Sequence, residues 1–157
     1  MTTRRLFLIL VAAGVLCPNA EAAPVVGPLS TYLVEPCRFV DTRDPVTFWY
    51  EPEGPALTAR LYLLQGSCGV PIGARAAMLN VTVVGATAAG HLSLWDLTPP
   101  KTSFLNFMPS RSVAGFVIAP LWEVQAGGDT ADFALMPGFA TPGQSVHVII
   151  DVVGFLR

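Results

Sequence analysis

The stretch Val146-His147-Val148-Ile149-Ile150-Asp151-Val152, near the C-terminus, decides the fold class. Its apolar residues at 146, 148, 150 and 152 alternate with His147 and Asp151, and a two-residue period is typical of a β-strand with one face toward a core. The same alternation runs through 57–63, 79–83, 92–95 and 131–135. In 57–63 it places Leu61 and Leu63 on the inward face. Shorter strands are expected over 37–42, 104–107 and 113–121, which makes about eight strands.

The turns between these strands are marked by Gly and Pro. The clusters lie at 52–55, 66–69, 85–90, 99–100, 109–110, 127–128 and 137–138. No stretch of ten residues combines a 3.6-residue period with freedom from helix breakers. We therefore predict an all-β fold, a single antiparallel β-sandwich or jelly-roll-like domain, and periodicity does not choose between these topologies. The segment 23–36 is either a lead-in or contributes an extra edge strand at 31–34.

The N-terminus has the pattern of a secretory signal. Arg4 and Arg5 precede the apolar run Leu6–Leu16, and the small-residue stretch Ala20-Glu21-Ala22 follows. This order of a charged region, an apolar region and an A-x-A site predicts a signal peptide over 1–22 and a domain over 23–157. The apolar run is shorter than the ~20 residues of a spanning helix, so we expect a secreted or cell-surface product with no membrane span.

Charge narrows the choice of partner. The formal charge of the chain is −2, and removal of 1–22 with Arg4, Arg5 and Glu21 makes it −3. Nucleic acid is disfavoured because its binding needs clustered cations. Only 13% of residues are charged, against roughly 25% in typical soluble domains. A surface so poor in charge favours a protein partner or self-association through an apolar face.

Two cysteines, Cys37 and Cys68, remain after the leader is removed. In an oxidising compartment two cysteines have one intramolecular connectivity, so we predict a Cys37–Cys68 disulfide. A metal pair and a reactive thiol are the alternatives. No His stands near either cysteine in the sequence, and two thiolates alone do not complete a zinc site.

Several short motifs, read in order, resemble a domain of secreted bacterial proteins that is frequent in actinobacterial and acidobacterial exports. They are Pro36-Cys37-Arg38-Phe39-Val40-Asp41-Thr42-Arg43, Cys68-Gly69-Val70-Pro71, Leu79-Asn80-Val81-Thr82-Val83, Gly90 with Ser103 and Asn106-Phe107, and Asp151-Val152-Val153-Gly154-Phe155. The resemblance implies a β-sandwich-like module and supports the pairing of the two cysteines. It implies no particular activity. The segment Met108-Pro109-Ser110 departs from the glycine-bearing turn of that pattern.

Catalytic signals are weak. On one strand His147 and Asp151 are four residues apart, about 13 Å at the rise of a strand, so they form no dyad there. Neither a G-x-S-x-G elbow nor an H-E-x-x-H helix occurs. We predict no enzyme activity, no cofactor and no metal site. His147 is interpreted as a strand-edge histidine and Asp151 as a turn or capping aspartate.

The remaining polar candidates are assigned structural roles. Asp41-Thr42-Arg43-Asp44 could offer oxygen ligands to Ca²⁺, but a structural pair of Asp41 and Arg43 is favoured. The four residues given structural polar roles are Asp41, Arg43, Asn80 and Asp151. Asn80-Val81-Thr82 also matches a glycosylation sequon, which we interpret as accidental. Asp129 and Asp132 flank a Gly-Gly turn and are predicted to be turn formers.

The aromatic run Phe48-Trp49-Tyr50 is the candidate binding site, since planar rings on a loop can stack on sugars or anchor a protein. Capping the end of the sandwich is the equal alternative. Trp95 and Trp122 are expected in the core or half-buried. The leading hypothesis is a secreted, non-enzymatic structural or interaction module that self-associates or binds an extracellular partner. A carbohydrate-binding module is the alternative, and a small hydrolase built on Asp41, Asp132 or Asp151 with a histidine is a third.

Overall fold

The structure, a computed structural model, describes residues 27–44, 59–96, 100–121 and 131–157. These residues form eight strands and no helix. The strands are β1 (Thr31–Asp41), β2 (Arg60–Tyr62), β3 (Ala76–Val84), β4 (Gly90–Trp95), β5 (Leu105–Phe107), β6 (Val113–Pro120), β7 (Phe133–Phe139) and β8 (His147–Leu156). Each contains or overlaps a predicted segment, and the predicted all-β class is confirmed. The segment 31–34 belongs to β1 and is not a separate strand.

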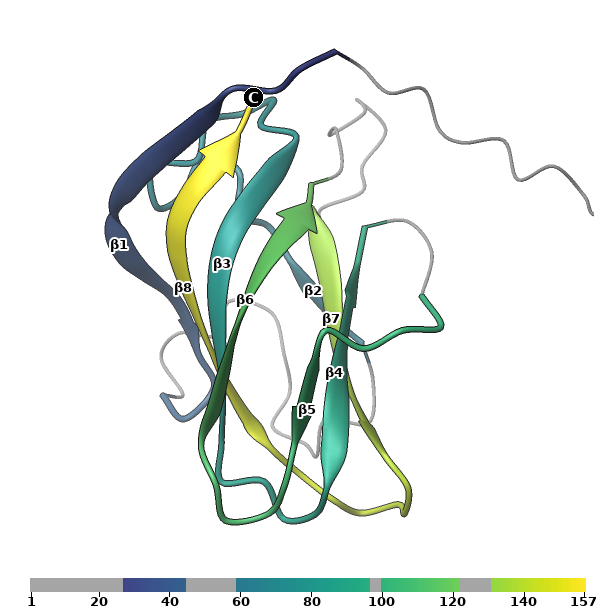
Figure 1. The fold of residues 1–157 in the computed structure, drawn as a ribbon. Helices are drawn as coiled ribbons and strands as arrows, with labels where there is room; N and C mark the ends of the chain where they lie inside the picture. The colour runs from purple at the N-terminus through teal and green to yellow at the C-terminus, as the bar shows by residue number, and fades with distance from the viewer. Residues whose placement is uncertain (1–26, 45–58, 97–99, 122–130) are drawn as a thin grey trace, which may run out of the picture.

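Two four-stranded sheets pack face to face (Figure 1). Sheet A has the order β1-β8-β3-β6 and sheet B the order β2-β7-β4-β5, and every pairing is antiparallel. Strand β1 pairs with β8, β2 with β7, β3 with β6 and β4 with β5. This nested pattern is that of one long antiparallel ribbon rolled up on itself, which is a jelly roll. The strand order thus decides between the two topologies that periodicity left open.

The core lies between the sheets, where the predicted inward positions of β3 and β8 are found. Leu79, Val81 and Val83 are fully buried, and Val148, Ile150 and Val152 pack beside them. Sheet B contributes Leu92, Phe133 and Leu135 from the other side. Alternation predicted these faces correctly because both sheets of a sandwich bury every second residue.

The inward face predicted for 57–63 is wrong. Leu61 and Leu63 are 66% and 50% exposed, whereas Tyr62 and Leu64 are buried. The ring of Tyr62 stacks on Phe133 with centroids 5.3 Å apart and meets Phe39 edge-on at 6.2 Å. An aromatic ring removes more apolar surface from water than a leucine, and its stacking adds to that. Which residues of this short strand face the core is therefore decided by rings on β7, beside it in sheet B, and on β1 of the other sheet.

The turn predicted at 137–138 is also wrong, because both residues lie within β7. Pro137 is opposite Leu92, whose carbonyl accepts a hydrogen bond from Phe104 N on the other side. The backbone groups of Leu92 therefore point away from β7. Pro137 and Leu92 form a non-hydrogen-bonded pair, in which residue 137 donates no N–H to β4. A proline fits there without breaking the ladder. Gly138 leaves room for the ring of His91, because a Cβ on residue 138 would lie only 2.3 Å from an atom of that ring.

A disulfide joins Cys37 on β1 to Cys68 in the loop between β2 and β3, with Cα atoms 5.5 Å apart. This confirms the predicted pairing. The register of β1 against β8 shifts between Leu33 and Cys37 and again between Arg38 and Val40. The first bulge brings Val34 against the loop. A Cβ on residue 69 would lie 3.3 Å from the Val34 side chain, so the loop passes close to β1 at Gly69. The bond therefore ties the edge strand of sheet A to the connection that arrives from sheet B.

Gly154 permits the close approach of β1 to β8. An added Cβ would lie 2.6 Å from the carbonyl oxygen of Tyr32 and 3.0 Å from Met78 Sδ. Backbone cannot yield as a side-chain tip does, so we expect Gly154→Ala to lower the free energy of unfolding by about 1–3 kcal/mol. Urea-induced unfolding measures the change. Gly27→Ala is the control, because nothing lies within 4 Å of its added Cβ, and equal stability of the two variants would contradict the prediction.

Candidate functional site

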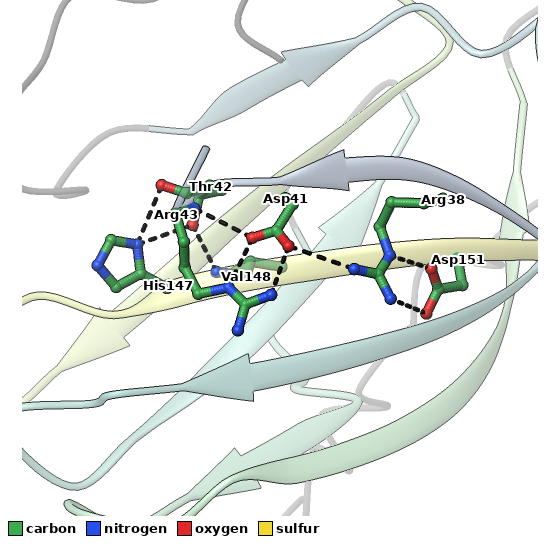
Figure 2. Close-up of polar contacts among 7 residues, drawn as sticks. All are labelled: Arg38, Asp41, Thr42, Arg43, His147, Val148 and Asp151. Atoms are coloured by element: carbon green, nitrogen blue, oxygen red, sulfur yellow. Dashed lines mark hydrogen bonds and ion pairs between the residues drawn. The ribbon is translucent and has the colours of Figure 1, made fainter. Parts of the chain in front are cut away.

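A ladder of four alternating charges runs along the β1–β8 half of the outer face of sheet A (Figure 2). Arg43 Nε and Nη2 donate to the two carboxylate oxygens of Asp41 at 2.8 and 2.5 Å. Arg38 Nη1 donates to Asp41 Oδ2 at 3.2 Å. The remaining nitrogens of Arg38 reach Asp151, Nε to Oδ1 and Nη2 to Oδ2. Two guanidinium groups thus neutralise two carboxylates, in a partly bidentate arrangement that fixes geometry as well as charge.

The ladder lowers the pKa of Asp41 below its ordinary value of 3.8. The side-chain hydrogen bonds from Arg43 are the largest cause, and the backbone N–H of Arg43 donates to the same carboxylate at 3.1 Å. Burial is the second-largest effect and raises the pKa, whereas the positive charges of Arg43 and Arg38 lower it further. Hydrogen bonds and positive charge both favour the ionised form of a carboxyl group.

Acid should therefore weaken the fold through Asp41. Its folded-state pKa is lower than that of the unfolded chain, so the stabilisation is present above about pH 4 and is lost as the pH falls toward the folded-state pKa. Carboxyl-carbon NMR titration should place the Asp41 midpoint below the ordinary range. Arg43→Ala should raise that midpoint more than Arg38→Ala does, because Arg43 donates more and shorter hydrogen bonds. An ordinary midpoint in the wild-type protein would contradict the prediction.

His147 begins β8 and faces Thr42, not a carboxylate (Figure 2). Its Nδ1 lies 3.0 Å from the carbonyl oxygen of Thr42 and 3.2 Å from Thr42 Oγ1. A carbonyl only accepts, so Nδ1 carries the proton. The hydroxyl oxygen also accepts from Val148 N at 2.7 Å. Nδ1 therefore cannot take a proton from the Thr42 hydroxyl, so Thr42 is not an activated nucleophile. The contacts between Thr42 and His147 join the end of β1 to the start of β8.

Asp132 has a different role from the predicted turn former. It is fully buried directly before β7, and its Oδ2 accepts from the backbone N–H groups of Leu64 and Gln65, both at 2.6 Å. Its Oδ1 accepts from Gln65 Nε2 at 2.7 Å, and Gln65 Oε1 in turn accepts from Gly73 N at 2.5 Å. The carboxylate therefore holds the first end of the loop that carries Cys68 directly, and the far end at Gly73 through the side chain of Gln65.

Asp151 likewise differs from the turn or capping aspartate expected from sequence. It lies in the middle of β8, paired across the sheet with Arg38 and Asn80. Arg38 was not singled out by sequence reasoning, because its partner is 113 residues away. Asn80 occupies the next position in the same row, on the face opposite the core. Among the described residues no three His, Cys, Asp or Glu side chains are grouped as a metal site would require.

The β6 half of the same outer face is apolar. Phe116 lies in the row of Asp151 and Asn80, and Ile118 lies in the row of Met78 and Gly154. Phe116 and Ile118 are 56% and 52% exposed, and Leu33 at the other end of the Ile118 row is 78% exposed. Ala114 and Pro120 extend the stripe along β6 and are exposed as well. Sequence missed this surface because both faces of 113–120 are apolar, so alternation did not show which one faces water.

Several predicted features lie outside the described residues. They are the signal peptide 1–22, the aromatic run Phe48-Trp49-Tyr50, Trp122 and Asp129. Trp95 is buried, as expected, on β4. The described part of the chain contains no helix long and apolar enough to cross a membrane.

Comparison with known proteins identifies no family. No family model matches the sequence, and no curated protein does. Two solved structures of the Tobacco streak virus coat protein are similar, each 13% identical. One covers 83% of this chain and 90% of the coat protein with a TM-score of 0.44, and the other, of the coat protein dimer, covers 78% and 86% with a TM-score of 0.42. The assignment of a jelly roll rests on the strand order of this chain.

Proposed function

We propose that this protein is a secreted, non-enzymatic interaction module that associates through the outer face of sheet A. The observation that carries the proposal is the exposure of Leu33, Phe116 and Ile118 on one face of one sheet. Water-facing positions of an antiparallel sheet are polar in most proteins that remain monomeric. Contiguous apolar surface on a folded domain usually marks an interface.

The polar half of the face supports association over catalysis. The guanidinium groups of Arg38 and Arg43 are occupied by carboxylates, and His147 is tied to Thr42. The ladder has no net charge, but its polar groups can orient a bound partner, as the polar rim of an interface does. Export rests on the leader at 1–22, and the Cys37–Cys68 disulfide is compatible with an oxidising compartment.

Two measurements on the purified protein test the proposal. Light scattering reports self-association, and retention of labelled protein on the cells that produce it reports binding to a surface partner. We expect at least one to be positive, and to be lost in Leu33→Lys/Ile118→Lys. The matched control is Leu61→Lys/Leu63→Lys, which changes two leucines outside this face that are likewise at least half exposed. A monomer that is not retained on those cells would overturn the proposed function, provided circular dichroism shows it folded.

A further inference from the structure

The four edge strands of the sandwich differ in how they are protected against pairing with another chain. In sheet B the edges are β2 and β5, which are only three residues each. In sheet A the β1 edge contains two register shifts, Glu35, Pro36, Arg38 and a disulfide. Short strands, bulges, prolines and charges are the devices by which proteins blunt an edge.

The β6 edge has few of these devices. It is eight residues long, Val113–Pro120, and contains no charged residue. Its pairing with β3 runs from Ala76 opposite Pro120 to Val83 opposite Val113 without a register shift. Its single proline is the last residue. No described strand lies beyond β6 in sheet A. A long, regular, uncharged edge is a template for one more strand.

The backbone groups that face outward from β6 follow from the hydrogen bonds to β3. Leu121 N donates to the carbonyl oxygen of Arg75, one residue beyond the pair Ala76–Pro120. In an antiparallel ladder this makes Pro120 a non-hydrogen-bonded position, with its backbone directed away from β3. Because the register is unbroken, the same holds for every second residue toward the N-terminus. The N–H and C=O groups of Ala114, Phe116 and Ile118 therefore face outward.

We infer that the occupant of this edge is β6 of a second copy of the chain, related by a two-fold axis at Phe116. This register sets Phe116 opposite its own mate and Ala114 opposite Ile118, so that all three outward N–H groups meet outward carbonyls. Pro120, which has no N–H, is left outside the central bonds. A two-fold axis brings Phe116 next to its own copy and pairs every other position with a different residue of the copy, so the strand must contain no charge that would meet a like charge. Strand β6 meets that requirement.

The dimer would join the two A sheets into one of eight strands and place the two apolar stripes side by side. Phe116 of each copy would contact the other across the axis, since opposed side chains of an antiparallel pair lie on the same face. This inference rests on the proposed function, because it names the partner and the place where the interaction face is continued.

Cysteine cross-linking tests the register, with Cys17→Ser in every variant to remove the leader thiol. Opposed Cα atoms in a hydrogen-bonded pair are about 5.5 Å apart, within disulfide range. Phe116→Cys should form a disulfide-linked dimer under mild oxidation. Ala114→Cys alone should not, since its mate lies about 13 Å away. A mixture of Ala114→Cys and Ile118→Cys proteins should again cross-link. The absence of this pattern in a dimeric protein would overturn the register and the interface.

Light scattering tests the association itself. Phe116→Lys sets two like charges across the axis and should raise the dimer dissociation constant at least about tenfold. Leu61→Lys, which adds the same charge at an exposed position of sheet B, should leave the dimer intact. A wild-type monomer at about 1 mM would overturn the inference. If that monomer still binds its producing cells through the face, the proposed function survives and only the dimer is lost.

Discussion

Asp132→Ala should lower the free energy of unfolding by about 3–5 kcal/mol. The substitution removes the acceptor of two buried backbone N–H groups, those of Leu64 and Gln65, together with the partner of the Gln65 amide. A buried donor left without an acceptor costs about 1–3 kcal/mol, because folding removes its hydrogen bond to water and no hydrogen bond within the protein replaces it. Asp132 is itself fully buried, so water does not replace the lost carboxylate without opening the loop.

Urea-induced unfolding followed by tryptophan fluorescence measures this effect. Asp132→Asn is the matched control, since an amide oxygen can still accept from both backbone groups and only the bond to Gln65 is lost. It should cost about 1–2 kcal/mol. Alanine and asparagine variants of equal stability would show that the backbone acceptor is not what stabilises the loop.

Replacing Cys37 and Cys68 together by serine should lower the free energy of unfolding by about 3–4 kcal/mol. The bond closes a loop between residues 31 apart in sequence, and its removal returns conformational freedom to the unfolded chain. Reduction of the wild-type protein should give the same loss, measured by urea-induced unfolding with and without reductant. A serine variant as stable as the oxidised protein would contradict the chain-entropy account.

These two effects should not be additive. Cys68 and the partners of Asp132 belong to the same loop, between β2 and β3, which is held by the disulfide from sheet A and by the carboxylate from sheet B. Groups that restrain one segment are coupled, and a double-mutant cycle measures the coupling. Once either restraint is lost, the loop can open, and the other restraint has less to hold in place. The triple variant should therefore lose less stability than the two separate losses combined.

Alternation along the chain correctly predicts the buried face of strands that have one side in the core and the other in water. In β3 and β8 polar and apolar residues alternate, and the burial of Leu79, Val81, Ile150 and Val152 follows the pattern. In β2 the pattern misled, because only three residues pair and the ring of Tyr62 finds Phe133 and Phe39. A short strand offers too few positions for its own periodicity to outweigh the aromatic packing of Tyr62 against β7 and β1.

The candidate site shows a sharper division. Asp41 and Arg43 are close in sequence, and their pairing could be proposed from the chain alone. Arg38 meets Asp151 only because β1 and β8, the first and last strands, lie side by side. The apolar stripe on β6 was equally hidden, since Val113–Pro120 is apolar at every position and only the second sheet decides which side it covers.

By itself the amino-acid sequence determined the all-β class, the eight strands of the described residues, the turns at 66–69 and 109–110 and the cysteine pair, since each depends on residue type and near neighbours along the chain. Tertiary structure alone decided the jelly-roll strand order, the phase of β2, the partners of Asp132 and Asp151, and which face of β6 meets water. Each of these depends on contacts between segments far apart in sequence, and a two-residue period contains no information on which strand lies next to which.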